Sequence, residues 1–188
     1  MKSSEVLFSK MTVGTKSVLF GVHCFFIHPF IVAIAWTNLY GFPLDPRLWF
    51  AFFIHDIGYW GCSSMDGVDG KKHPILGGRI TKFLFGEFWG DFVTYHSRGI
   101  ARNDGKDTSP LCIADKLAWS IEPFWTYLPR AYLSGEIYEY MDSAKRHGWK
   151  FDNSRQWYRL IQSYSLDVVR DLQDNGQGLW CSSDHAKL

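Results

Sequence analysis

The sequence predicts an all-α protein, and three observations lead to this fold class. No segment alternates apolar and polar residues over a sustained run, and no Asp-Gly pair lies between alternating apolar runs, so strand and hairpin signals are scarce. Residues that typically stop and start helices punctuate the chain, including Gly41 and Asp45-Pro46. The segment 154–174 repeats apolar residues at spacings of three and four, which is typical of an amphipathic helix facing a core. These residues are Trp157, Leu160, Ile161, Tyr164, Val168 and Leu172.

The composition is that of a packed globular chain. With 188 residues, 46% of them hydrophobic, the chain is long enough to bury a core as one domain. A formal net charge of +1 gives no electrostatic reason to expect nucleic acid or an anionic membrane surface as a partner. The cysteines form no CxxC pair, which favours reduced thiols in a cytoplasmic protein. They are Cys24, Cys62, Cys112 and Cys181.

One apolar stretch, Val18–Trp36, raises the question of a membrane span. It contains His23, His28 and Pro29, which a membrane span tolerates poorly outside functional positions. It also lacks the basic start and the cleavage site of a signal peptide. We therefore expect a buried helix here and no membrane partner.

The elements of the first half are predicted from their boundaries. We expect Thr15–Tyr40 to form one long helix, or two that break near Pro29, ending at Gly41. Asp45-Pro46 then caps and opens a helix whose C-terminal end carries His55-Asp56.

The second half alternates helices with polar loops. A glycine-rich loop is expected over Gly61–Lys72 and a charged loop over Ser97–Thr108. The expected helices are Pro74 to about Phe85, Glu87–His96, one opened by Ser109-Pro110 that carries Asp115, about Arg130–His147, and Ser154–Asp174.

Histidine and aspartate residues stand within or at the ends of several of these helices. They are His28, His55, Asp56, His73, His96 and Asp115. Each one alone is explained by packing or by a surface charge. Four segments with one imidazole or carboxylate each, together with the His-Asp pair, indicate a shared metal site. His23 lies on the same apolar stretch as His28 and is the alternative first ligand.

This order, His…His-Asp…His…His…Asp, resembles the HD-domain superfamily of metal-dependent phosphohydrolases. The resemblance covers Val22–Pro123 and includes an apolar run into His-Asp-Ile-Gly at Phe50–Gly58. Further matches are His73-Pro74-Ile75-Leu76-Gly77, Tyr95-His96-Ser97-Arg98-Gly99, Ile113-Ala114-Asp115-Lys116-Leu117 and Ile121-Glu122-Pro123. The last three look most like the branch that hydrolyses dinucleoside tetraphosphates. The implied fold is an HD-domain helical bundle, one domain over residues 1–188 with a core of about 16–128 and a C-terminal helical extension at 129–188.

Two departures from the HD-GYP branch bear on the substrate class. Tyr59 follows the His-Asp-Ile-Gly run, where the HD-GYP cyclic-dinucleotide phosphodiesterases carry lysine. The chain also has no Gly-Tyr-Pro loop after His96. The resemblance therefore does not imply cyclic-dinucleotide hydrolysis.

The resemblance implies a site with two divalent transition-metal ions. His28, His55, Asp56 and Asp115 would hold one ion, and His73 and His96 the second, with Asp56 bridging. This mixed ligand set suits Fe, Mn, Co or Ni, with Mg and Zn also open. The implied activity is hydrolysis of a phosphoester or phosphoanhydride bond by a metal-bridging hydroxide, with Asp56 and His55 in the catalytic centre.

Phosphate binding requires further positive charge, which Tyr59 cannot supply. The basic candidates are Lys71, Lys72, Arg79, Arg98, Arg102, Lys106 and Lys116. Among them Arg98 and Lys116 are the preferred catalytic candidates. The expected substrate is a nucleotide or a similar small phosphorylated molecule.

Two other functions remain open on the sequence. A branch of HD proteins uses the same ligand order to hold a mixed-valent di-iron centre that activates dioxygen. A non-catalytic binding module could also keep the HD fold. The helices from Arg130 onward either complete the pocket or form the interface of a homo-oligomer.

Overall fold

The computed structural model describes residues 10–180 of the chain. Ten α-helices and two short 3-10 helices have their bounds within this range, and no strand occurs among these residues, so the all-α prediction is confirmed. The elements are α2 (Val13–Phe20), α3 (His28–Tyr40), α4 (Pro46–Ile54), η1 (Ile57–Tyr59), η2 (Gly70–Lys72), α5 (His73–Phe85), α6 (Glu87–Thr94), α7 (Arg98–Asn103), α8 (Pro110–Ile121), α9 (Phe124–Ser134), α10 (Glu136–Arg146) and α11 (Ser154–Asp174).

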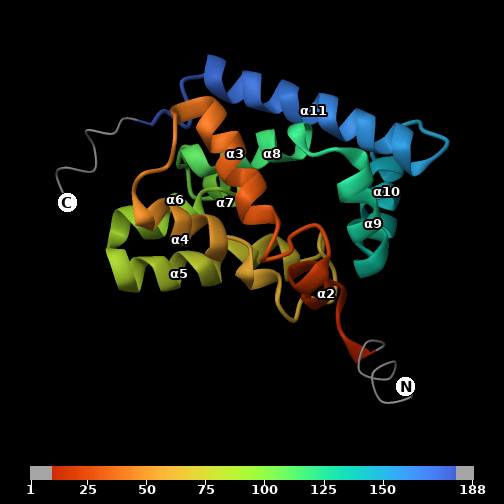
Figure 1. The fold of residues 1–188 in the computed structure, drawn as a ribbon, viewed down its shortest axis with the longest axis horizontal. Coiled ribbons are helices and arrows are strands. Elements are labelled where there is room, and N and C mark those ends of the chain that lie inside the picture. The colour runs from red at the N-terminus through yellow and green to blue at the C-terminus, as the bar shows by residue number, and fades with distance from the viewer. Residues whose placement is uncertain (1–9, 181–188) are drawn as a thin grey trace.

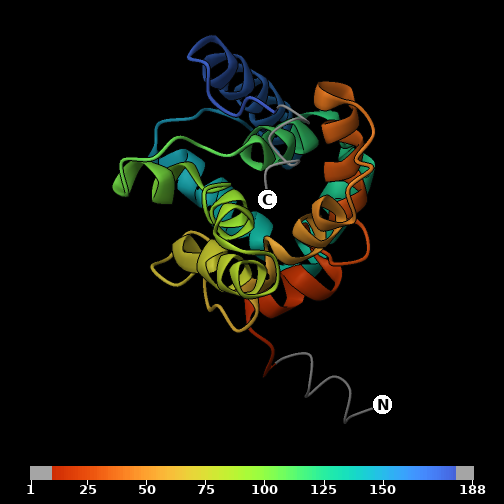
Figure 2. The same cartoon turned by 90° about the vertical axis from the view of Figure 1, so that its left-hand side faces the viewer.

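Helix α8 is the centre of the arrangement. It packs against α3 on one side and α11 on another, and α5 packs against α6 (Figure 1). Helix α11 runs along one edge of the molecule from the region of α3 to α9 and α10, and α2 lies at the opposite edge (Figures 1 and 2). One buried cluster joins α3, α4, α6 and α8, and a second joins α9, α10 and α11. The C-terminal helices are thus packed onto the helices before them: α11 lies against α8, which carries Asp115, and α9 lies against α2.

The apolar stretch at the N-terminus forms two helices with a break between them. Helix α2 ends at Gly21 and α3 begins at His28, so Pro29 lies in the first turn of α3, where its missing N–H is not needed. The backbone of the break is held from elsewhere, because Arg130 donates to the carbonyls of Gly21 and Val22. The alternative of a broken helix is therefore the observed one.

Helix α4 forms as its boundary residues predict. Asp45 accepts a hydrogen bond from the Arg47 N–H at 2.8 Å, which caps the first turn. The helix ends at Ile54, and His55 closes it. Asp56 lies between α4 and η1. His55 and Asp56 therefore both lie, buried, at the C-terminal end of α4.

Two of the expected elements are wrong. The single helix expected over about Arg130–His147 is two helices, α9 and α10, because Gly135 takes a left-handed conformation with φ of +87° between them. The charged loop expected over Ser97–Thr108 contains α7, which Ser97 caps by accepting from the Ile100 N–H.

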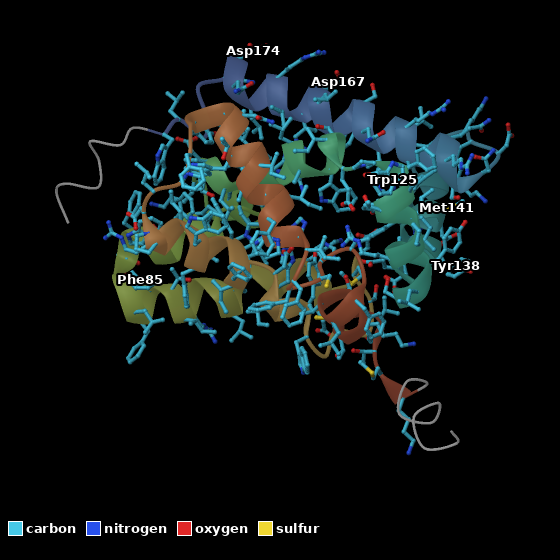
Figure 3. All side chains as sticks on the ribbon, viewed as in Figure 1. Phe85, Trp125, Tyr138, Met141, Asp167 and Asp174 are labelled. Atoms are coloured by element: carbon cyan, nitrogen blue, oxygen red, sulfur yellow. The ribbon has the colours of Figure 1, made fainter. Side chains whose placement is uncertain are left out.

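Helix α11 has the predicted bounds but not the predicted face. Leu160 is 40% exposed and Tyr164 48% exposed, so these two members of the apolar stripe do not lie in the core. Tyr158 and Val169 are buried in their place. Asp167 and Asp174 project from the outer side of the helix (Figure 3). The buried face of α11 packs mainly against α8 and also contacts α9.

The remaining expectations concern the membrane and the thiols. No helix within residues 10–180 is long and apolar enough to cross a membrane. Cys24, Cys62 and Cys112 are free and buried, while Cys181 lies outside the described residues.

Candidate metal centre

The six histidine and aspartate side chains singled out by the sequence lie together. His28 and His73 begin α3 and α5, each followed by a first-turn proline. The His55-Asp56 pair follows α4, His96 follows α6, and Asp115 lies within α8. Five separate segments therefore deliver one cluster of side chains, in which all members except the partly exposed His73 are buried.

The first group consists of His28, His55, Asp56 and Asp115, whose nearest ligand atoms all lie within 4.8 Å of one another. His28 Nε2 is 3.2 Å from Asp115 Oδ1 and 3.4 Å from Asp56 Oδ2. His55 Nε2 is 3.0 Å from Asp56 Oδ2 and 3.9 Å from Asp115 Oδ1.

The second group uses the other oxygen of the same carboxylate. His73 Nε2 is 3.3 Å and His96 Nε2 3.5 Å from Asp56 Oδ1. The two Nε2 atoms are 3.1 Å apart. Asp56 therefore lies between the two groups, with Oδ2 toward His28 and His55 and Oδ1 toward His73 and His96.

Backbone hydrogen bonds determine which ring nitrogen is free. Nδ1 of His55, His73 and His96 lies 2.9, 2.7 and 2.6 Å from the carbonyl oxygens of Phe52, Gly70 and Val93, respectively. A carbonyl oxygen only accepts, so each Nδ1 carries a hydrogen, and a ring in its neutral form presents its Nε2 lone pair to the cluster. This orientation by a backbone partner is common for metal-binding histidines.

The Nε2 atoms of His73 and His96 lie close together, with no hydrogen-bond donor between them among the described residues. Two neutral rings whose Nε2 atoms are both acceptors cannot hydrogen-bond to each other, and a cation between or beside them could bind both lone pairs across the 3.1 Å that separates His73 from His96. His55 Nε2 and Asp56 Oδ2 are likewise buried without a hydrogen-bond partner. Buried groups of this kind are costly unless a cation satisfies them.

The pKa shifts of the cluster residues show which of them carry charge. Burial by itself raises the pKa of Asp56, but the imidazoles of His55, His23 and His28 hold it well below its usual range. Burial lowers the pKa of His73 to about 3, which keeps that ring neutral and able to bind a metal. His28 differs: burial lowers its pKa, but its hydrogen bond to Asp115 and the nearby negative charge of Asp56 outweigh burial and raise the pKa to about 10. The two carboxylates thus favour positive charge at this position of the cluster.

The spacing of the donor atoms fits metal coordination. Ligand bonds of about 2.0–2.2 Å place neighbouring ligand atoms roughly 2.8–3.6 Å apart around one ion in octahedral or tetrahedral geometry. The distances between ligand atoms given above fall in this range, except the 3.9 Å from His55 to Asp115. The buried histidines and aspartates could therefore hold a metal ion.

His23, the alternative first ligand, lies beside the cluster and belongs to neither group. Its Nδ1 is 2.8 Å from Ser17 Oγ and 3.3 Å from Glu136 Oε2, and its Nε2 is 3.9 Å from Asp56 Oδ2. Glu136 is fully buried, and the hydrogen bond to His23 holds its pKa below the usual range against the effect of burial. Sequence reasoning missed Glu136, because it lies more than one hundred residues from His23 in the chain.

Tyr59 is part of the wall of the site. Its ring stacks on His73 with centroids 4.0 Å apart and planes 12° apart, and it lies 4.6 Å from the ring of His23. Burial raises the pKa of the phenol well above its ordinary value, so the side chain stays neutral. It supplies packing to the histidines where lysine would supply charge.

A cleft of about 340 Å³ opens onto the cluster. Asp56, His73, His96 and Asp115 line it together with Arg98 and Lys116. Lys116 Nζ is 3.2 Å from Asp115 Oδ2, and this carboxylate raises the pKa of the lysine although burial lowers it. The other five basic candidates are exposed and do not line this cleft: Lys71, Lys72, Arg79, Arg102 and Lys106. The positive charge nearest the cluster thus comes from Arg98 and Lys116.

Comparison of the chain with models of protein families, with curated proteins and with solved structures found no match. The all-α fold and the buried cluster are therefore established by the sequence and the structure, and the assignment to the HD superfamily stays a prediction from the motifs.

Proposed function

We propose that this protein is a metal-dependent hydrolase of a phosphoester or phosphoanhydride bond in a nucleotide or similar small phosphorylated molecule. One observation supports the proposal above the others. The carboxylate of Asp56 lies between two sets of imidazoles and offers one oxygen to each. The order of the ligands along the chain resembles that of HD-domain phosphohydrolases and supports the same activity.

The residues of the cluster would hold two divalent cations. His28, His55 and Asp115 suit one ion, His73 and His96 suit the other, and Asp56 suits both. Divalent cations in such a site lower the pKa of a bound water and neutralise charge on phosphoryl oxygens. The chain itself contributes the orientation of the rings through the carbonyls of Phe52, Gly70 and Val93.

Arg98 and Lys116 would bind the phosphate. Both side chains line the cleft in which the acidic and imidazole groups lie. Lys116 also lies 5.7 Å from the centre of the Trp119 ring, which together with Asp115 limits the directions its ammonium group can take. A fixed cation beside the reacting phosphoryl group stabilises the negative charge of the transition state.

The decisive experiment replaces the shared carboxylate by an amide of the same shape. Wild-type protein, Asp56→Asn and the control Asp167→Asn, whose side chain is 67% exposed on α11, are purified without chelator, and their metal content is measured. Phosphate release is then screened over nucleotides with Mn, Fe, Co and Mg. We expect Asp56→Asn to lose bound metal and to lose activity on the order of 100-fold or more, with unchanged helical content.

Three results would contradict the proposal. Full activity in Asp56→Asn would separate the cluster from catalysis. Oxygen uptake by iron-loaded protein without phosphate release would indicate the di-iron oxygenase instead. Absence of both metal and activity in the wild-type protein would indicate a non-catalytic binding module.

A further inference from the structure

A second cavity of about 370 Å³ adjoins the metal cleft. Its lining comes from α8, α10, α11, the segment between the last two helices and the loop between η1 and η2. The lining residues are Asp66, Trp119, Tyr140, Ser143, Ala144, His147, Trp149, Trp157, Ile161 and Tyr164. Four of them, Asp66, Trp119, Tyr140 and Tyr164, also line the metal cleft. The two cavities therefore share a wall, and we call the second one the aromatic compartment.

Five aromatic rings line this compartment in contacting pairs. Tyr140 and Trp157 are nearly parallel, with planes 9° apart and centroids 6.3 Å apart. Trp149 and Tyr164 meet edge to face with centroids 5.4 Å apart. Trp119 contacts Tyr140 edge to face at 5.8 Å, at the border with the metal cleft. Rings that support one another in this way present a preformed surface on which a flat group can stack.

The two cavities differ in chemistry. The metal cleft is lined by Arg98, Lys116 and the carboxylates and imidazoles of the cluster, whereas no lysine or arginine is among the residues that line the aromatic compartment. A phosphate group favours the first environment, and a planar ring favours the second. Asp66 borders both cavities and offers its exposed carboxylate to the hydroxyl or amino groups of a ligand that spans them.

We infer that the aromatic compartment binds the base of a nucleotide substrate while its phosphate lies at the metal centre. The inference rests on the proposed function, since it assigns the phosphate end of the ligand to that site. A ring stacked on aromatic side chains contributes about 1–3 kcal/mol per base. The volume of the compartment falls in the range of sites for ligands of nucleoside size. A small quaternary ammonium group would also be attracted to ring faces, but it would leave most of this volume unfilled.

The test uses nucleosides without phosphate, so that binding is measured independently of turnover. Adenosine, guanosine, cytidine and uridine are titrated by calorimetry into wild-type protein, Tyr164→Ala and Trp149→Ala. The control is Tyr138→Ala, whose ring is 66% exposed on α10 and lines neither cavity. We expect the dissociation constant of at least one nucleoside to rise roughly 5- to 150-fold in Tyr164→Ala and Trp149→Ala, and to be unchanged in Tyr138→Ala. Tyr164 is half exposed, so this substitution leaves the fold intact.

Turnover provides the second comparison. With manganese-loaded wild-type protein, KM for a nucleoside 5′-monophosphate should be lower than KM for ribose 5-phosphate. Trp149→Ala, whose ring lines the aromatic compartment but not the metal cleft, should remove most of this difference, and Tyr138→Ala should leave it unchanged. Nucleoside binding by the wild-type protein, with no phosphate release from any compound, would overturn the proposed function and leave the inference about the compartment standing. No binding of any nucleoside, binding unaffected by both compartment substitutions, or tighter binding of choline than of nucleosides would overturn the inference.

Discussion

At the scale of single residues, the site depends on how closely backbone segments approach each other. A Cβ atom on Gly58 would lie 2.0 Å from the carbonyl oxygen of His73, which is far inside contact distance. The glycine that follows the His-Asp pair therefore allows η1 to lie against the start of α5. This approach sets the position of His73 relative to Asp56.

Gly58→Ala tests this packing. The added methyl group must displace the backbone of His73, so we expect a loss of about 1–3 kcal/mol in the free energy of unfolding and reduced metal content. Urea unfolding and metal analysis measure the two effects. Gly99→Ala is the matched control, because its Cβ would meet only Ser97 Oγ at 3.7 Å. Equal stability and metal content in the two variants would show that the close approach does not position the ligand.

A separate prediction concerns the two positively charged side chains that line the cleft. Arg98→Met and Lys116→Met each remove a positive charge from the cleft and keep most of the side-chain volume. A hydrogen bond to a charged group contributes about 1.5–3 kcal/mol, so kcat/KM for the phosphorylated substrate should fall roughly 10- to 150-fold in each variant. Lys106→Met, exposed and outside the cleft, should leave kcat/KM unchanged. Unchanged kinetics in both cleft variants, with metal content retained, would remove these residues from phosphate binding.

At the scale of elements, one buried ion pair holds the break before α3. Arg130 of α9 pairs with Glu122 at the end of α8 and donates to the carbonyls of Gly21 and Val22. Glu136 at the start of α10 accepts from the Val22 N–H at 2.6 Å. The C-terminal helices thus determine where the chain enters α3, and with it where His28 lies.

Arg130→Met would leave the carboxylate of Glu122 buried without its cation. Breaking a buried pair in this way costs about 3–5 kcal/mol, and we expect a loss of that size in urea unfolding. Arg146→Met is the control, because Arg146 pairs with Asp142 on the exposed surface of α10 and such pairs contribute about 0.3–0.5 kcal/mol. A loss below 1 kcal/mol in Arg130→Met would mean that water replaces the pair and that α9 does not anchor the break.

At the scale of the whole molecule, the cluster joins segments that span residues 28 to 115. A cation bound by all of them stabilises the folded chain and has no comparable site in the unfolded chain. Free metal at 100 times its dissociation constant adds about 2.7 kcal/mol of stability. For a chain of this size that corresponds to a rise in Tm of roughly 5–11 °C.

Chelation should therefore lower Tm by this amount, and added metal should restore it. Thermal unfolding followed by circular dichroism, with and without a chelator, measures the shift. Asp56→Asn should show little response to chelator, because its shared ligand is absent. A wild-type Tm that is the same in chelator and in metal would argue against a metal bound by the cluster.

Local sequence accounts for most of the helices and for the chemistry of the cluster. Helix boundaries carry their own signals, such as the Asp45 cap and the first-turn prolines 46 and 110, so α4 and α8 were predicted from the sequence. The division of α9 from α10 was not predicted, because Gly135 ends a helix only through its left-handed backbone. The face of α11 was misassigned at Leu160 and Tyr164, since periodicity identifies an apolar stripe but not the elements that cover it.

By itself, the sequence determined the helical class and the six side chains that converge, because residue type and spacing express helix periodicity and ligand chemistry directly. Metal binding by these side chains stays a prediction. Only the tertiary structure decided that Asp56 faces both sets of imidazoles, that Glu136 lies behind His23, and that an aromatic compartment adjoins the cleft. These contacts join residues far apart in the chain, and no local pattern records which distant side chains the packing of α8, α10 and α11 brings together.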